Sequence, residues 1–272
     1  MPVYLLADNG SKIPEATICL RKLAKKLGEQ TGKHIYAVSL QHADSIHPSL
    51  LGNTPAEIFH DFLQQQLEQG EREFVLLPLF FGASRALTSF IPEQVSRLEK
   101  QFGEFNLKLA DVVFPLSEND YRLADILFEY VQKINNQQPV KINDIVIVDH
   151  GSPVPHITEV RKQVALGLQS LLGENFSLGQ AVMERREGAE YNFNGELLEK
   201  YLSKQAEQGV KNIIVAMLFF LPGRHAGECG DVQEICDRVV SQYPFMKIII
   251  TPLISEHELL ISILRDRLLS VE

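Results

Sequence analysis

The stretch IVAMLFFLPGRHAGECGDVQEI, residues 214–235, decides how the rest of the chain is interpreted. Its apolar first part predicts a buried strand, a Pro-Gly turn follows, and a helix is expected from Asp231, soon after His225. A second stretch, IVIVDHGSP at 145–153, has the same order of apolar strand, histidine and glycine turn around His150. Two histidines that follow buried strands can share one pocket, so these two are the first candidates for a functional site.

The two halves of the chain repeat each other. DNGS at residues 8–11 matches DHGS at 149–152, and LFFGASRAL at 79–87 matches LFFLPGRHA at 218–226. The identical LFF segments and the shared four-residue pattern are stronger signals than a general likeness between two α/β halves. Internal repetition on this scale predicts a duplicated fold.

Apolar runs and helical periodicities alternate in the same order in both halves, as expected of parallel α/β units. In the first half, strands are expected at 3–7, 34–40, 74–81 and 107–113, a loop at 82–89, and helices after residue 11, from residues 55 and 92, and over 121–133. In the second half, strands are expected at 145–148, 177–183, 213–220 and 247–253, and helices around 164–172 and 197–202 and from residue 231. With NNQQP at 135–139 as linker, two units are predicted, 1–138 and 139–272, each a four-stranded parallel sheet with helices on both faces.

Composition limits the function classes. The chain has 272 residues, enough for two small α/β units that each bury a core. Its net charge of −9 argues against nucleic-acid binding, and no apolar run approaches the roughly 18 residues of a membrane helix. Three cysteines, Cys19, Cys229 and Cys236, are too few for a disulfide framework, which fits a reducing compartment. The N-terminal segment lacks the basic region of a signal peptide, so a cytoplasmic or plastid-like protein is expected.

The halves differ where the candidate histidines lie. Asn9 stands in the first half where the second half has His150, and Ala86 stands where it has His225. Ligands of parallel α/β sheets bind beyond the carboxyl ends of the strands, which is where both histidines are expected. The asymmetry predicts a single working site, on the second half or facing it.

These residues carry a family resemblance. Residues 150–152 (HGS) after the first strand, Glu184 after the second and LFFLPGRHAGECGD at 218–231 after the third resemble the class II chelatases, the CbiX-type sirohydrochlorin chelatases. The resemblance implies two flavodoxin-like units that face each other across a cleft, where a divalent metal is inserted into a tetrapyrrole. It implies His150 and His225 as the metal-binding and proton-accepting pair, and Glu184 as their acidic partner.

The chain also departs from the family pattern. Arg185, Arg186 and Glu187 replace the run that usually follows the glutamate, and Glu187 is a close alternative to Glu184 as the acidic partner. Cys229 appears between His225 and the following aspartate, where it is either an extra soft ligand or a small buried hydrophobe.

The chemistry itself asks for these residue types. Metal insertion removes two pyrrole protons and delivers a partly dehydrated cation, so it needs bases near neutrality and exchangeable ligands. Imidazole, with an unperturbed pKa of about 6.5, serves both needs and suits Co²⁺, Fe²⁺ or Ni²⁺, with no organic cofactor required. Two histidines and one carboxylate leave coordination positions open. Substrate carboxylates are expected to meet Arg185, Arg186 and Arg224, or the turn amides of Gly151 and Ser152.

Other functions are weaker interpretations. Asp149, His150 and Ser152 are adjacent in sequence, whereas hydrolytic triads converge from separate segments. The main alternative is a non-catalytic relative that binds a tetrapyrrole or a metal as a carrier, sensor or assembly partner, suggested by a first half that lacks both site histidines and by the changed residues around Glu184. The metal and the tetrapyrrole stay open. A duplicated chain already supplies the two units that short family members obtain by dimerising, which is compatible with a monomer and leaves larger assemblies open.

Overall fold

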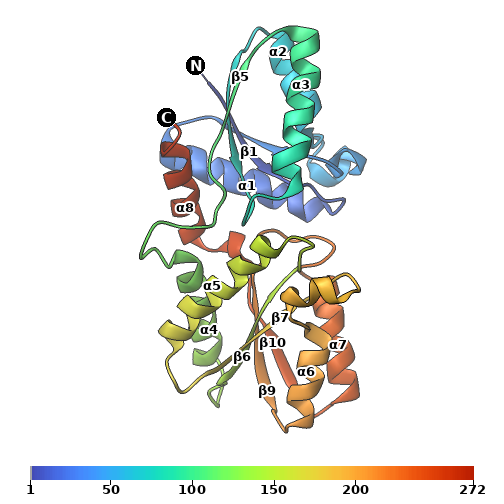
Figure 1. The fold of residues 1–272 in the computed structure, drawn as a ribbon, viewed down its shortest axis with the longest axis vertical. Coiled ribbons are helices and arrows are strands. Elements are labelled where there is room, and N and C mark those ends of the chain that lie inside the picture. The colour runs from blue at the N-terminus through green and yellow to red at the C-terminus, as the bar shows by residue number, and fades with distance from the viewer. Residues whose placement is uncertain (1) are drawn as a thin grey trace. The chain divides into compact units, whose positions relative to one another are not determined.

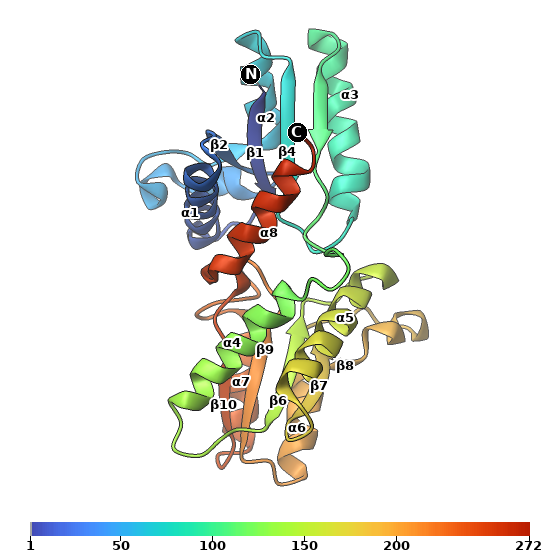
Figure 2. The same ribbon diagram turned by 90° about the vertical axis from the view of Figure 1, so that its left-hand side faces the viewer.

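The computed structural model describes residues 2–272 and divides them into two compact units. One unit comprises the chain up to Pro115 together with Leu260–Glu272, and the other comprises Leu116–Leu259. Within the described residues, each unit contains one all-parallel sheet of five strands (Figures 1 and 2). The predicted flavodoxin-like α/β class is confirmed, while the predicted four strands per sheet become five.

The first sheet has the strand order β3-β2-β1-β4-β5. Its strands are β1 (Val3–Asp8), β2 (Ile35–Ser39), β3 (Glu57–Ile58), β4 (Glu73–Pro78) and β5 (Asn106–Leu109). Its helices are α1 (Pro14–Thr31), α2 (Phe59–Glu68), α3 (Ile91–Phe102) and most of α8 (Glu258–Leu269), with short turns η1 (Ala43–Ser45), η2 (Pro48–Leu51) and η3 (Ala86–Phe90). In both ribbon views α1 and α8 lie on one face of this sheet, and α2 and α3 lie on the other.

The second sheet repeats the same topology, with the order β10-β9-β6-β7-β8. Its strands are β6 (Asp144–Asp149), β7 (Ser177–Val182), β8 (Glu196–Leu197), β9 (Asn212–Met217) and β10 (Lys247–Ile250). Its helices are α4 (Arg122–Asn136), α5 (Pro155–Leu172), α6 (Leu198–Glu207) and α7 (Asp231–Gln242), with the short turns η4 (Ala189–Asn194) and η5 (Ile254–Glu256). Helices α4 and α5 pack together on one face, and α6 and α7 pack together on the other.

The central strands form the core of each unit. In β6, Ile145, Val146, Ile147 and Val148 are fully buried. Burial on both sides is what a strand between two helical layers requires, and it explains why the strand is apolar throughout rather than alternating. The register pairs Asp149 at the end of β6 with Val182 at the end of β7. The carboxyl edge of the sheet, where ligands of parallel α/β proteins bind, therefore begins directly after this apolar run.

Several predicted boundaries shift. The fifth strand of each sheet is a two-residue segment, β3 or β8, that occupies residues expected to begin a helix, so α2 starts at Phe59 and α6 at Leu198. The predicted loop at 82–89 ends in a π-helical turn, Ala86–Phe90, that runs into α3. The first part of the predicted linker belongs to the end of α4. There the buried Asn135 side chain forms two hydrogen bonds with the backbone of Ile142, which hold the segment that follows the helix.

Two helices, α4 and α8, each pack in a different unit from the strands that precede them in the chain. α4 follows β5 in the chain but packs in the second unit, where Tyr130 donates a hydrogen bond to the Leu253 carbonyl (3.1 Å). α8 follows β10, yet from Leu260 onward it packs in the first unit. The sequence interpretation did not predict α8. The expected boundary between 138 and 139 stays a prediction about the repeat, while the packing units are divided at other residues.

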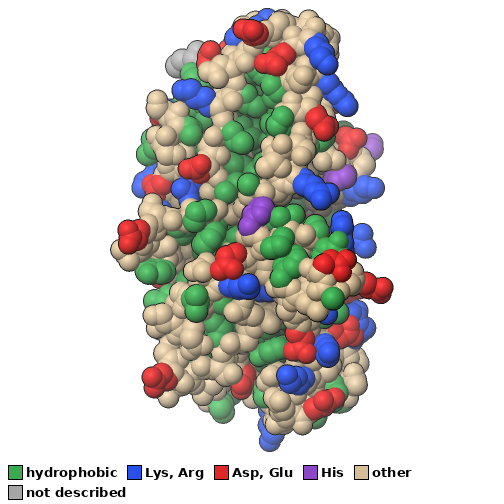
Figure 3. Space-filling view, viewed as in Figure 1, with side chains coloured by type: hydrophobic (Ala, Val, Ile, Leu, Met, Phe, Trp, Pro, Cys, Tyr) green, Lys and Arg blue, Asp and Glu red, His purple; other side chains and the backbone are tan. Residues whose placement is uncertain are grey.

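The surface and the helices can be compared with the two functions that the composition argues against, nucleic-acid binding and membrane spanning. In the face drawn in Figure 3, acidic and basic side chains are interspersed, without a continuous basic surface on that face. No helix among residues 2–272 combines the length and the apolar character needed to cross a membrane.

Candidate functional site

The candidate site lies at the carboxyl ends of three neighbouring strands of the second unit. β6 is the middle strand of the three and leads directly into His150. Its neighbour β7 is followed by Met183 and Glu184, and its other neighbour β9 leads into the loop that carries His225. Parallel strands end at one edge, so residues distant in sequence meet there.

The two histidines are in direct contact. Their ring centroids are 4.5 Å apart and the rings meet edge to face at 73°. Nε2 of His150 lies 3.3 Å from Oε1 of Glu184, and both side chains are about half exposed, at 45% and 60%. Of the two candidate acidic partners, Glu184 is thus the one whose carboxylate approaches an imidazole. The site presents two rings to solvent, with the Glu184 carboxylate beside the His150 ring.

An aspartate holds the His225 ring. Nδ1 of His225 lies 2.6 Å from Oδ2 of Asp231, the first residue of α7. The backbone reinforces this pairing, because the amides of Asp231 and Val232 donate to the carbonyls of Arg224 and His225 at 3.0 and 3.2 Å. A hydrogen bond at Nδ1 leaves Nε2 as the nitrogen for a metal or a proton. Asp231 is the last residue of the 218–231 motif. Its position shortly after His225 in that motif was the sequence signal that could have identified it as the partner of this ring.

The His150 loop is shaped by a glycine. Gly151 has φ +90°, and a Cβ at this position would lie 2.0 Å from the Glu184 carbonyl oxygen. The Glu184 amide in turn donates to the His150 carbonyl (3.2 Å), and Nδ1 of His150 donates to the Gly151 carbonyl (3.0 Å). Only glycine permits this close approach of two backbones. The loop therefore fixes the histidine beside the end of β7.

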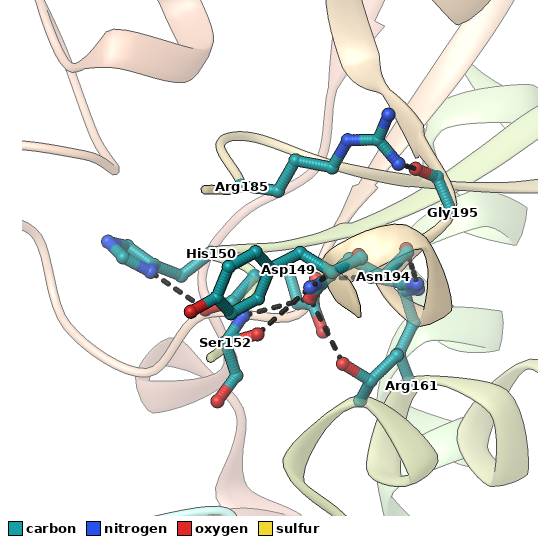
Figure 4. Close-up of polar contacts among 10 residues, drawn as sticks. Asp149, His150, Ser152, Arg161, Arg185, Asn194 and Gly195 are labelled. Atoms are coloured by element: carbon teal, nitrogen blue, oxygen red, sulfur yellow. Dashed lines mark hydrogen bonds and ion pairs between the residues drawn. The ribbon is translucent and has the colours of Figure 1, made fainter. Parts of the chain in front are cut away.

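Ser152 has a different role from the one predicted. Its amide donates to Oδ1 of Asn194 (2.9 Å), and its carbonyl accepts from Nδ2 of the same side chain (2.9 Å; Figure 4). The expected anion contact at this amide is wrong, because the donor is already satisfied and α5 begins only at Pro155. Asn194 belongs to η4 and is fully buried. Nothing in the sequence indicated this partner.

The residue before His150 is also anchored. Asp149 forms an ion pair with Arg161 of α5, whose other terminal nitrogen donates to the Asn194 carbonyl (Figure 4). Arg161 is buried, at 2% exposure. Burial raises the pKa of the Asp149 carboxyl above its usual range, and the neighbouring guanidinium opposes this by favouring the charged form.

The predicted arginines lie around this edge. Arg185 is exposed and donates to the Gly195 carbonyl (2.8 Å; Figure 4). Arg224 is 81% exposed, with Nε 3.9 Å from the Asp231 carboxylate, and the Arg186 guanidinium lies 5.9 Å from the Tyr191 ring centre. Cys229 is exposed and adopts φ +58° in the loop before α7, so it is not a buried hydrophobe.

The equivalent edge of the first unit has the same backbone but different side chains. Gly10 has φ +89°, and a Cβ there would lie 1.7 Å from the Gln41 carbonyl oxygen. The Gln41 amide donates to the Asn9 carbonyl (3.1 Å), as Glu184 does to His150. Asn9, Gln41 and Ala86 therefore occupy the places of the two histidines and the glutamate. Among residues 2–272, no set of three or more His, Cys, Asp or Glu side chains is arranged to hold a metal ion.

Two repeated parallel α/β units with an imidazole pair at one sheet edge are the arrangement of a class II chelatase-like protein. The family model described as CbiX matches residues 3–133 and 144–271, so the chain belongs to the CbiX family. No curated protein sequence matches the chain.

Solved structures share this fold across the whole chain. SirB from Bacillus subtilis with Fe³⁺ has a TM-score of 0.70 at 12% identity, covering 100% of this chain and 96% of that one. Sirohydrochlorin chelatase SirB from Bacillus subtilis subspecies spizizenii in complex with cobalt has a TM-score of 0.67 at 11% identity, with 100% and 95% covered. CbiX, described as the terminal enzyme for biosynthesis of siroheme in denitrifying bacteria, has a TM-score of 0.60 at 13% identity and full coverage of both chains.

Proposed function

We propose that this protein inserts a divalent metal, Co²⁺, Fe²⁺ or Ni²⁺, into sirohydrochlorin or a closely related tetrapyrrole. The observation that carries the proposal is the edge-to-face contact of His150 and His225, with ring centroids 4.5 Å apart at the ends of adjacent strands. Membership of the CbiX family and the metals named for the SirB structures support the substrate class.

His150 and His225 share two tasks in this proposal. Each offers one ring nitrogen to the incoming cation, and two neutral ligands bind weakly enough for the metal to move on to the macrocycle. When the metal has left, the same nitrogens accept the protons that the pyrroles release. The half-exposed rings leave coordination positions open to the substrate.

The carboxylates give the protons a route away from the rings. In this scheme a protonated His150 donates from Nε2 to Glu184, and the 60% exposure of that side chain lets it pass the proton on to water. Asp231 stabilises the positive charge on His225 when that ring is protonated, because its oxygen lies 2.6 Å from Nδ1. Each imidazole therefore has its own carboxylate partner, and the pair returns to the neutral, metal-binding state after every turnover.

Exposed arginines supply the substrate contacts in this scheme. Arg224 and Arg185 lie beside the two histidine loops, and a guanidinium pairs with a carboxylate through two hydrogen bonds. Sirohydrochlorin carries peripheral carboxylates, so these side chains orient the ring while its centre faces the imidazoles.

The test is metal insertion by the purified chain. Sirohydrochlorin is incubated with Co²⁺, Fe²⁺ or Ni²⁺, and the absorbance change is followed for wild type, His150→Ala and His225→Ala. His47→Ala is the matched control, because His47 is an exposed histidine of the first unit. We expect both site variants to lose most of the rate and the control to keep it. A wild-type rate equal to the spontaneous rate with every metal would exclude the enzyme, and tetrapyrrole binding without insertion would support the non-catalytic alternative.

A further inference from the structure

We propose that Arg161 and Asn194 are positioning residues that hold the His150 loop in its working geometry. Neither touches the imidazole. The effect on metal exchange rests on the proposed function, while the effect on the loop stands on its own. The inference comes from four polar contacts of the buried Arg161 and Asn194 side chains, which lie near the exposed side chain of His150.

The first contact pair fixes the far end of the loop. The Asn194 side-chain amide accepts from the Ser152 amide and donates to the Ser152 carbonyl, both at 2.9 Å. These two hydrogen bonds engage the Ser152 backbone in the way that a neighbouring β-strand would. Asn194 is itself held, because Oδ1 also accepts from Thr158 (3.1 Å) and Nδ2 also donates to the Tyr191 carbonyl (3.1 Å). The full hydrogen-bonding capacity of the amide is used in a site that is closed to water.

The second contact pair fixes the near end. Arg161 forms an ion pair with Asp149, the last residue of β6, and donates to the Asn194 carbonyl. Arg161 is 2% exposed and Asn194 is fully buried. The residues on both sides of His150 and Gly151 are therefore tied to one buried pair of side chains. The backbone between these anchors has little freedom to move.

The exposure of the His150 ring explains why such anchoring matters. With 45% of its side chain open to solvent, the ring is held by few neighbours, namely the His225 ring, the Glu184 carboxylate and the Gly151 carbonyl. Its position relative to His225 depends on the backbone from which it projects. A displacement of about 1 Å in such a site can cost a hundredfold in rate.

The first unit supplies an internal comparison. By the repeat, Leu20 stands in α1 where α5 has Arg161, and Pro55 stands where the second half has Asn194. There Asp8 is satisfied by Ser39, which donates at 2.8 Å from the register position that Val182 holds in the second sheet. The half without the site histidines thus has Leu20 and Pro55 at these two positions, although Arg21 of α1 donates to the Pro55 carbonyl (2.7 Å) as Arg161 does to that of Asn194. The arginine contact to the loop before the short edge strand therefore occurs in both units, whereas the Asp149–Arg161 ion pair and the Asn194 bonds to Ser152 accompany the imidazoles.

This comparison provides a variant that is expected to fold. Arg161→Leu combined with Val182→Ser transfers the Asp8–Ser39 arrangement to Asp149 and keeps that carboxylate hydrogen-bonded. Asn194→Ala is the direct variant. Thr158→Val is the matched control, because it removes one bond to the Asn194 oxygen and leaves both bonds to Ser152 in place.

Two measurements test the proposal. Amide hydrogen exchange of the segment around Ser152 reports the loop, and titration of the chain with Co²⁺ alone, followed by sirohydrochlorin, reports the site. We expect exchange to rise about tenfold or more in Asn194→Ala and clearly in the double variant, since each lost bond of this kind changes an equilibrium about five- to tenfold. Cobalt affinity is expected to fall about tenfold, with the KM for sirohydrochlorin nearly unchanged.

The outcomes separate the two proposals. A wild-type chain that neither binds Co²⁺ nor inserts it contradicts the proposed function, while the exchange measurement still decides the positioning role. Wild-type exchange and wild-type cobalt affinity in either folded variant overturn the positioning role. The same holds if Thr158→Val changes exchange and affinity as much as Asn194→Ala, because the effect is then general destabilisation.

Discussion

Nδ1 of His225 lies 2.6 Å from the Asp231 carboxylate at the start of α7. Replacing this aspartate by asparagine keeps the shape but removes the charge that stabilises a protonated ring and selects its tautomer. We expect Asp231→Asn to lower the metal-insertion rate about 10- to 100-fold with little change in the unfolding free energy. Asp237→Asn, an exposed position on the same helix, serves as control. A rate within twofold of wild type would show that His225 does not need its partner.

Gly151 is predicted to be irreplaceable for a steric reason. Alanine at this position would force its Cβ into the Glu184 carbonyl, at 2.0 Å, and would also strain a backbone with φ +90°. Gly173 has a similar φ of +76° but open space around it, so it isolates the strain alone. Gly173→Ala is expected to cost about 1 kcal/mol of unfolding free energy. Gly151→Ala should cost clearly more and should displace His150, measured by urea unfolding and metal insertion. Equal losses in the two variants would contradict the backbone contact.

Asp8 predicts a pH-dependent stability in the first unit. Burial raises its pKa from 3.8 to about 6, although the Ser39 hydroxyl and backbone amides oppose the shift. The folded state therefore binds this proton more tightly than the unfolded state. The resulting stabilisation is fully present below about pH 4 and is lost as the pH rises through about 6.

The variant Asp8→Asn tests this sign. At pH 7 the wild type loses up to about 3 kcal/mol by ionising a buried carboxyl, which asparagine avoids. We expect the variant to be more stable than wild type at pH 7 and nearly equal to it at pH 4, as measured by urea unfolding across this range. A stability difference that does not change with pH would mean that Asp8 titrates normally.

The cysteines are expected to react in a fixed order. Cys229 is exposed, whereas Cys236 is buried in α7, and its burial raises the pKa of the thiol to about 12. Only the thiolate attacks alkylating reagents, so Cys236 should stay unlabelled at pH 8 until the protein unfolds. Peptide mapping after brief iodoacetamide treatment checks this order. Labelling of Cys236 before Cys229 in the folded chain would contradict the burial of α7.

Local sequence signals located the histidine pair because both residues follow apolar strands in repeated motifs. The same logic placed Glu184 after β7, and the structure brings it to His150. Arg161 and Asn194 gave no such signal, since Asp149 and Ser152, which they hold, lie 12 and 42 residues away and meet them only in the folded unit. Burial of an arginine on a helix depends on the carboxylate that faces it, which no periodicity records.

Helix placement shows a second limit of sequence patterns. The order of strands and helices is the same whether α4 and α8 cover their own sheets or exchange them. Only packing distinguishes these topologies. α8 was also missed because apolar residues occupy most of its length, so its helical periodicity is weak; the buried ones are Leu260, Ile261, Ile263, Leu264 and Leu268.

The exchange of α4 and α8 has a consequence for the order of events during synthesis. The strands of the first unit leave the ribosome early, but α8, one of the two helices on one face of their sheet, contributes residues 260–269, near the end of the chain. The first unit must wait, with apolar surface uncovered, while the whole second unit is translated. The unit that lacks the site histidines is thus the last to be completed, and a chain interrupted anywhere before α8 leaves it unfinished.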